Sequence, residues 1–399
     1  MLRQIPTDKL RPGMYVDLSS VNWIDHPFLR SGIFIEDDSS LSEIRAAGWD
    51  NVTIDTEKGA DLVDDERIVA SVICAPKSVA IVSPDSSTAP TAFHDELVTA
   101  RGIHARASEI IRQVMADARI GQLSDFNDVS SLADEMILSI TRNSSALVSL
   151  TSLKTRDDYT FMHCVSVGIF MIGLGRQLGL TGQDLQLLGT AGLLHDVGKA
   201  EVPLEVLNKP GALTMDESVL MRAHPTLGYA ALVRAGYSVE SVLHVVLHHH
   251  EKLTGEGYPS GLASDEIPLF TRIASVADVY DAVTSNRVYH SAMPPTAALR
   301  MIRKRAGLDF DSTVAQALIK VVGIYPIGSM VRLSSSLLAV VSELNHHNTA
   351  KPIVLAFYSI QKEAYIKPER IDLAGSDVVI ESDEDPLEWG LDVRRFWHL

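Results

Sequence analysis

The spacing of apolar residues changes along the chain and separates regions with different expected structures. Between Glu96 and about Val322, apolar positions recur three and four residues apart, as in 96–118 and 129–150, which is the pattern of amphipathic helices. Within this region, residues 161–175 are apolar almost throughout. This stretch is shorter than the ~20 residues that a membrane-spanning helix needs. It therefore predicts a buried helix in an all-α region.

The flanks of this region show strand-like patterns instead. Before it, short strand-like runs at 13–18 and 51–56 accompany a helix-like pattern at 41–49, which predicts a small α/β domain. After it, runs at 329–344, 351–359 and 376–382 predict strands separated by polar turns. Residues 75–91, between the first two regions, are rich in Pro, Ser, Ala and Thr and show no sustained periodicity, which is typical of a linker. The predicted divisions are a small α/β domain at 1–74, a linker at 75–91, a helical bundle at 92–322 and a β appendage at 323–399.

Charge and cysteine content narrow the classes of partner. The chain has 51 acidic and 35 basic residues, a formal net charge of −16, which disfavours binding to DNA, RNA or anionic membranes. A small anionic ligand can still bind where basic residues converge. Two cysteines, Cys74 and Cys164, cannot build a disulfide framework, and charged residues such as Arg3 and Lys9 stand where a signal peptide would be apolar. We therefore expect a cytoplasmic protein without a membrane span.

Histidines and acids recur through the predicted helical bundle. Imidazole and carboxylate together suit Zn, Fe or Mn better than Mg or Ca, and ligands on packed helices would meet in the core. On a helix, His195 and Lys199 would share a face while Asp196 would lie about 100° round and could bridge two ions. Such a bridging carboxylate is typical of a two-metal hydrolase. The candidate positions are His163, His195, Asp196, Lys199, His224, His248, His249, His250, Asp278 and Asp281.

Similar dipeptides elsewhere in the chain lack this context. His94–Asp95 and His346–His347 have no surrounding Gly, Lys or downstream acid, and we interpret them as a helix N-terminus and a polar turn. Taken singly, His163 or His224 would more often be a core histidine with satisfied hydrogen bonds. The ordered set of segments carries the prediction.

That ordered set resembles the HD-GYP family of HD-domain phosphohydrolases. The matching motifs are His163, "HDVGK" at 195–199, His224, "HHExxxGxGYPxGL" at 249–262 and "ADVYDAxxxxR" ending at Arg287. The resemblance covers roughly residues 95–320 and implies an HD-type helical bundle as the catalytic core; His248 lies outside the pattern. Residues 10–59 resemble an N-terminal domain of unknown function that often accompanies HD-GYP modules.

The resemblance implies a metal-dependent phosphodiesterase of bacterial second-messenger signalling, which hydrolyses cyclic di-GMP to pGpG and often on to GMP. It also implies two divalent ions, Fe or Mn by expectation, with Zn or Ni as alternatives. The ligands that it implies are His163, His195, Asp196 and Asp278 for one ion, and Asp196, His224, His249 and His250 for the other.

Further residues would act on the substrate. Lys199, with Asp196, is assigned to catalysis because its ammonium would neutralise charge developing on the scissile phosphate; a surface lysine or an ion pair with an acid is the alternative. Gly257, Tyr258 and Arg287 are assigned to substrate binding, Arg287 through its planar guanidinium. Asp281 is also assigned to substrate binding. Its alternative roles are to orient a histidine or to form a salt bridge on the helix face.

Three positions depart from the family pattern. Tyr159 stands where members with a third metal carry Glu, so two metals are expected; His290 occupies a position that is often basic, and Thr254 one that is usually Asp. None of these removes a ligand of a two-metal site.

Two other functions remain as alternatives. A cyclic di-GMP sensor or interaction module with little turnover is disfavoured by the complete ligand set, and an HD hydrolase of another nucleotide is disfavoured by the GYP loop. For the N-terminal domain, signal sensing, homodimerisation or binding of a protein partner, and capping of the bundle all stay open.

Overall fold

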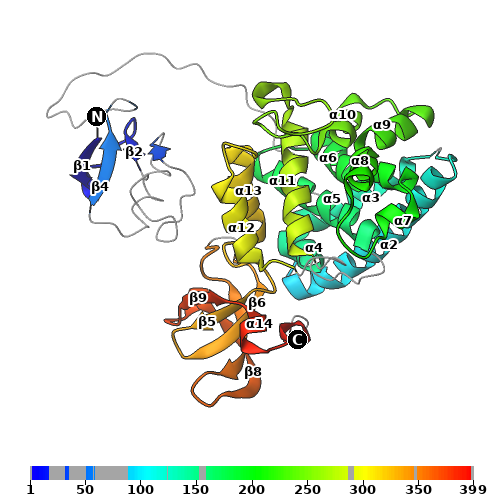
Figure 1. Cartoon of the computed structure of the whole chain (residues 1–399). Helices are drawn as coiled ribbons and strands as arrows, with labels where there is room; N and C mark the ends of the chain where they lie inside the picture. Colours follow the sequence, from blue (N-terminus) through cyan, green and yellow to red (C-terminus); the bar gives the residue numbers. More distant parts are fainter. Residues whose placement is uncertain are drawn as a thin grey trace. The chain divides into compact units, whose positions relative to one another are not determined.

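The computed structural model of the protein describes residues 2–17, 32–35, 51–56, 58, 89–123, 125–151, 159–285, 292–345 and 348–396. Contacts divide the chain into two compact units, residues 1–83 and 84–399. Each unit is described by itself below. Figure 1 shows the elements with their labels.

The first unit contains an antiparallel sheet with the strand order β1-β4-β2-β3. The strands are β1 (Leu2–Pro6), β2 (Tyr15–Asp17), β3 (Gly32–Phe34) and β4 (Asn51–Asp55). Val16 pairs with Ile54 across β2 and β4, and both side chains are fully buried together with Ile5 of β1. The strands predicted in 13–18 and 51–56 are confirmed, whereas the helix expected at 41–49 lies outside the described residues.

The helical part of the second unit begins with α2 (Phe93–Arg119), α3 (Asn127–Arg142) and α4 (Ser144–Leu150). The helical pattern over 129–150 is interrupted at Asn143, which has an extended backbone with φ −156°. Its side-chain oxygen accepts hydrogen bonds from the backbone N–H groups of Ser145 and Ala146. An asparagine that caps the next helix in this way ends one helix and starts another.

Helix α5 (Tyr159–Gln177) is the buried helix predicted from the apolar run. Side chains all around it are inaccessible, including Val165, Ile169 and Ile172, so neighbouring helices surround it. Its neighbours include α2, α6 (Gln183–Leu194), α11 (Leu269–Thr284) and α13 (Ser312–Val322). None of the helices in the described part of the chain is long and apolar enough to cross a membrane.

Shorter helices complete the bundle. They are η3 (Val197–Glu201), α7 (Leu204–Leu207), α8 (Met215–Arg222), α9 (His224–Arg234), α10 (Glu240–His248) and α12 (Pro295–Lys304). In Figure 1 they appear in green to yellow. The ends of several of them carry the histidines of the candidate site.

A five-stranded antiparallel sheet with the order β8-β7-β6-β5-β9 follows the helices. Its strands are β5 (Met330–Leu333), β6 (Leu337–Glu343), β7 (Ile353–Ser359), β8 (Ala364–Asp372) and β9 (Ile380–Glu384). Thr296 and Arg300 of α12 both donate hydrogen bonds to Asp383 of β9, which ties the sheet to the bundle. Strand β8 is absent from the sequence prediction because its side chains are mostly exposed and polar and Pro368 interrupts them; both features suit an edge strand.

Candidate metal centre

Five segments of the bundle bring histidines and acids together. His163 lies within α5, His195 and Asp196 follow α6, His224 begins α9, His249 and His250 follow α10, and Asp278 and Asp281 lie on α11. All of these side chains are buried except that of His250, which is 24% exposed. The predicted meeting of these residues in the bundle core is therefore seen in the structure.

Asp196 occupies the middle of the group. Its Oδ1 lies 3.2 Å from His224 Nε2 and 3.9 Å from His249 Nε2. Its Oδ2 lies 3.4 Å from both His163 Nε2 and His195 Nε2. Each carboxylate oxygen thus faces a different pair of imidazoles, which is the geometry of a carboxylate that can bridge two cations.

Four of the imidazoles are oriented in the same way. In each, Nδ1 faces an oxygen acceptor and Nε2 points toward the centre of the group, so the Nδ1–H tautomer leaves the Nε2 lone pair facing inward. The acceptors are Asp281 Oδ2 for His163 at 2.6 Å, Gly192 O for His195 at 2.7 Å, Met221 O for His224 at 2.8 Å, and Val246 O for His249 at 3.1 Å.

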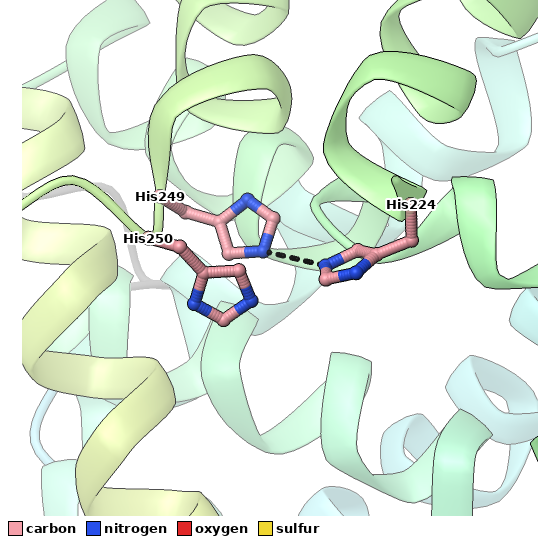
Figure 2. A group of neighbouring side chains, drawn as sticks. All are labelled: His224, His249 and His250. Atoms are coloured by element: carbon pink, nitrogen blue, oxygen red, sulfur yellow. Dashed lines mark hydrogen bonds between the residues drawn. The ribbon is translucent and has the colours of Figure 1, made fainter. Parts of the chain in front are cut away.

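This donor set fits bound cations. His224 Nε2 and His249 Nε2 lie 3.2 Å apart (Figure 2). Because the Nδ1 atom of each ring faces a carbonyl oxygen, the two Nε2 lone pairs point at each other. A cation bound by both nitrogens would remove the repulsion between these lone pairs. Among the described residues, the buried His195 Nε2 and Asp196 Oδ1 have no hydrogen-bond partner. The groups His224, His249, His250 and His163, His195, Asp278 each offer ligand atoms within 4.8 Å of one another.

The protonation states of His249, His250 and Asp196 also suit metal binding, whereas Asp196 and Asp278 outweigh burial and raise the pKa of His195. Burial lowers the pKa of His250 to about 3, although Asp278 opposes this shift. Burial and the neighbouring imidazoles hold the pKa of His249 well below its usual range. Burial alone would raise the pKa of Asp196, but Lys199 and the histidines outweigh it and lower that pKa strongly. Neutral imidazoles and an ionised carboxylate are the forms that bind metal.

The segment from His195 to Lys199 is not the α-helix that the sequence analysis assumed. Helix α6 ends at Leu194, and the 3₁₀ helix η3 starts at Val197. A Cβ on Gly198 would lie 1.9 Å from the backbone oxygen of His224, so this glycine lets the start of α9 approach the turn. Lys199 Nζ reaches Asp196 Oδ2 at 2.5 Å, which is the ion pair named as its alternative role.

Asp278 and Asp281 lie three residues apart on α11 and both contact His163. Asp278 Oδ1 is 3.0 Å from His163 Nε2, on the side of the cluster, while Asp281 Oδ2 is 2.6 Å from His163 Nδ1, on the far side of the ring. Asp281 is only 1% exposed. Its carboxylate faces a candidate ligand, which favours orientation of a histidine, one of the alternative roles named for it; its grouping with the substrate-binding residues stays a prediction.

The glycine-rich loop after His250 is held by Glu251, a role that the sequence analysis missed. One Glu251 oxygen accepts the backbone N–H groups of Ser260 and Gly261 at 2.7 and 3.1 Å, and the other accepts that of Leu262 at 3.1 Å. A Cβ on Gly257 would lie 2.4 Å from the Glu251 Cα. The close approach expected at Gly257 therefore involves the loop's own backbone.

Tyr258 of this loop lies against the cluster. Its ring stacks on His250 with centroids 4.8 Å apart and planes at 28°. Burial, with Asp278 and Asp196 adding to it, raises the pKa of Tyr258, so its hydroxyl stays protonated and can donate a hydrogen bond. The first histidine of the triplet, His248, instead packs on His244 with ring centroids 4.4 Å apart.

Some predicted positions lie outside the described residues. These are Arg287 and His290, the side chain of Tyr159, and the pair His346–His347. Thr254 is described and forms an isolated bridge with Ala263 in the loop.

Comparison with known proteins places this geometry in a family. A family model described as HD domain matches residues 144–314, and a domain of unknown function, DUF3391, matches residues 2–129. A cyclic di-GMP phosphodiesterase of Pseudomonas aeruginosa is 40% identical over 374 residues, which are 94% of this chain and 89% of that protein.

Two further relatives match shorter stretches of the chain. A cyclic di-GMP phosphodiesterase response regulator of Xanthomonas campestris is 40% identical over 148 residues, 37% of this chain and 39% of that protein. A 3'3'-cGAMP-specific phosphodiesterase of Vibrio cholerae is 34% identical over 171 residues, 43% of this chain and 37% of that protein. Because one relative is similar over nearly its full length and the HD-domain match spans every residue of the cluster, the chain belongs to the HD-GYP family of HD-domain phosphohydrolases.

Proposed function

We propose that this protein is a metal-dependent phosphodiesterase that hydrolyses cyclic di-GMP, with pGpG or GMP as the product. The observation that carries the proposal is the buried cluster in which Asp196 faces two pairs of inward-pointing imidazoles. A binding module has no need for such a cluster, because desolvating these polar groups costs stability unless ions compensate. The similar proteins that are named cyclic di-GMP phosphodiesterases support the choice of substrate.

The proposed ligand sets follow the two sides of Asp196. One ion would be held by His163, His195, Asp196 and Asp278, and the other by Asp196, His224, His249 and His250. Two such ions, iron or manganese by our proposal, would supply an activated water and positive charge for the phosphoryl oxygens.

The protein's own residues would bind and polarise the substrate. Lys199 lies within hydrogen-bond distance of Asp196, so its ammonium can reach a phosphoryl oxygen placed beside that carboxylate and stabilise the charge of the transition state. The protonated hydroxyl of Tyr258 is a second donor at the edge of the cluster. Arg287 stays a prediction from the sequence, as a guanidinium for a phosphate or a guanine edge.

We also propose the domain division predicted from the sequence and a cytoplasmic location. The described helices of the catalytic region begin at Phe93 and end at Val322, and the next strand starts at Met330. The N-terminal domain is proposed to mediate self-association or contact with a protein partner.

Turnover by protein purified without oxygen tests this function. The metal-free chain is loaded with Fe(II) or Mn(II), bound metal is counted by elemental analysis, and products from cyclic di-GMP and from 3'3'-cGAMP are separated by chromatography. We expect about two ions per chain and metal-dependent release of pGpG or GMP. Nucleotide that binds but stays intact under every metal condition would favour the sensor alternative, and faster turnover of 3'3'-cGAMP would change the substrate.

The bridging role of Asp196 is tested with Asp196→Ala. This variant should lose both ions and turnover together, because one carboxylate serves both ligand sets. Asp265→Ala is the control, since that acid is fully exposed and pairs with Arg272. Normal metal content in Asp196→Ala would refute the bridging assignment.

A further inference from the structure

Arg222 stands beside the metal centre without a role in the ligand sets. It ends α8, two residues before His224, and its side chain is exposed. The guanidinium carbon lies 4.5 Å from the centroid of the Tyr258 ring, a distance at which a cation and an aromatic ring attract each other. Because Tyr258 itself stacks on His250, Arg222 lies one aromatic ring away from a candidate ligand.

Among the described residues, the Arg222 guanidinium contacts the Tyr258 side chain but no carboxylate. Several other exposed arginines of the bundle and sheet pair with carboxylates, as Arg234 does with Glu201, Arg300 with Asp383 and Arg370 with Glu343. Within the described part of the chain, no carboxylate lies within 4.0 Å of the Arg222 guanidinium. In a protein with a net charge of −16, an unpaired cation beside the site is a local attractor for an anion.

The contact with Tyr258 prepares this cation for ligand binding. A guanidinium that lies over an aromatic ring keeps its N–H groups at the edge of its plane, where they can donate in a fork to phosphate oxygens. The ring also restricts the long side chain, so less conformational entropy is lost when an anion binds. The exposed position leaves the fork accessible from solvent.

A cyclic dinucleotide carries two phosphodiesters, and only one of them can occupy the metal centre during cleavage. The other must lie further out, next to the residues that border the cluster. We propose that Arg222 binds this second phosphodiester and so favours cyclic dinucleotides over substrates with a single phosphate. This inference rests on the proposed function, because it takes cyclic di-GMP as the substrate.

The competing explanation is structural. A positive side chain in the last turn of α8 interacts favourably with the helix dipole, and Arg222 could serve only to hold Tyr258 in place. In that case its loss would disturb every substrate that uses the cluster. Comparison of two substrates separates the explanations: cyclic di-GMP has a second phosphodiester, whereas bis(p-nitrophenyl) phosphate has only the one that is cleaved.

The test uses the whole metal-loaded chain of 399 residues and its Arg222→Ala and Arg222→Lys variants. For Arg222→Ala we expect KM for cyclic di-GMP to rise about tenfold, as for the loss of a charge-assisted hydrogen bond, with kcat and metal content unchanged. The kcat/KM for bis(p-nitrophenyl) phosphate should stay at the wild-type value. Arg222→Lys should lie between the two, because it keeps the charge but loses the planar fork.

Salt dependence and a matched variant complete the design. KM for cyclic di-GMP should rise with NaCl concentration in the wild type and more weakly in Arg222→Ala, since one ionic contact is gone; a purely structural role would not change this slope. Arg234→Ala removes an exposed arginine that already has a carboxylate partner and should leave both substrates unaffected.

Three results would overturn the inference. An equal loss of kcat/KM for both substrates in Arg222→Ala would show that Arg222 acts only on the structure of the site. An unchanged KM for cyclic di-GMP, with turnover intact, would refute the contact while leaving the proposed function in place. Wild-type protein that cleaves bis(p-nitrophenyl) phosphate but not cyclic di-GMP would refute the proposed function itself, and the inference with it.

Discussion

Replacement of Asp281 by alanine tests the geometry behind the metal centre. The Asp281 carboxylate accepts a hydrogen bond from His163 Nδ1 at 2.6 Å, and both residues are 1% exposed. Asp281→Ala removes this acceptor from a buried imidazole, which both weakens the basicity of Nε2 and lets the ring rotate away from Asp196. We expect weaker metal binding on the side of the cluster that contains His163.

The magnitude follows from the kind of contact. Loss of a partner that orients a ligand typically costs about 10- to 100-fold in metal affinity, which is roughly 1.4 to 2.7 kcal/mol. The contact here is short, buried and made by a carboxylate, so we expect the upper half of this range. The histidines on the other side, His224 and His249, are oriented by backbone carbonyls that the substitution leaves in place. One of two binding steps should therefore weaken and the other should not.

Calorimetric titration of the metal-free protein with Mn(II) measures the two steps. Asp281→Asn should lose less affinity than Asp281→Ala, because an amide oxygen can still accept from Nδ1–H. Asp265→Ala serves as the control for removal of an exposed acid. At saturating metal, KM for cyclic di-GMP should equal the wild-type value. Unchanged metal affinity combined with a higher KM would refute the reasoning and favour the grouping of Asp281 with the substrate-binding residues.

Three further predictions address the turn, the loop and pH. Gly198→Ala should lower the free energy of unfolding by about 3 kcal/mol and weaken metal loading, since the new Cβ would collide with the His224 backbone. The control is Gly102→Ala in α2, whose Cβ would meet nothing within 4 Å and which should raise the free energy of unfolding by about 0.5 to 1 kcal/mol. Denaturant unfolding measures both changes. Glu251→Ala should raise KM and lower thermal stability, with Glu251→Gln in between, because three backbone N–H groups lose their acceptor; an unaltered KM would contradict its role in holding the loop. Lowering the pH from about 7.5 to about 5.5 should lower the urea midpoint of the metal-free protein, because His250, with its pKa of about 3, and His249, whose pKa is also lowered, take up protons more readily in the unfolded chain. The raised pKa of His195 opposes this change and offsets part of it. A midpoint that rises on acidification would contradict this sign.

The sequence was sufficient for the parts of the site that depend on helix periodicity and on ordered motifs. Asp278 and Asp281 share a face of α11 because they are three residues apart, and both do meet His163. The buried helix around His163 followed from its apolar run. These relations follow from local spacing in the sequence, so they do not depend on contacts with the rest of the fold.

Relations set by tertiary contacts were not accessible in this way. The turn after Leu194 depends on the close approach of Gly198 to the start of α9, and no local pattern records that approach. In the sequence, Glu251 is simply an acidic residue within a motif. Its hydrogen-bond partners are backbone N–H groups nine to eleven residues later in the chain. Its role becomes visible only when the loop has folded back over it.

The orientation of the histidines links the two kinds of information. His195, His224 and His249 each stand one or two residues after the last residue of a helix, and each directs Nδ1 at a carbonyl of that helix's final turn. Those carbonyls have no partner within the helix, so the helix end itself supplies the acceptor. His163 lies inside α5, where the carbonyls of its own helix are already used by the backbone. An acceptor from another element is then required, and the carboxylate of Asp281 provides it. The position of a histidine relative to a helix end therefore predicts whether its orienting partner must be sought in the backbone or in a distant side chain.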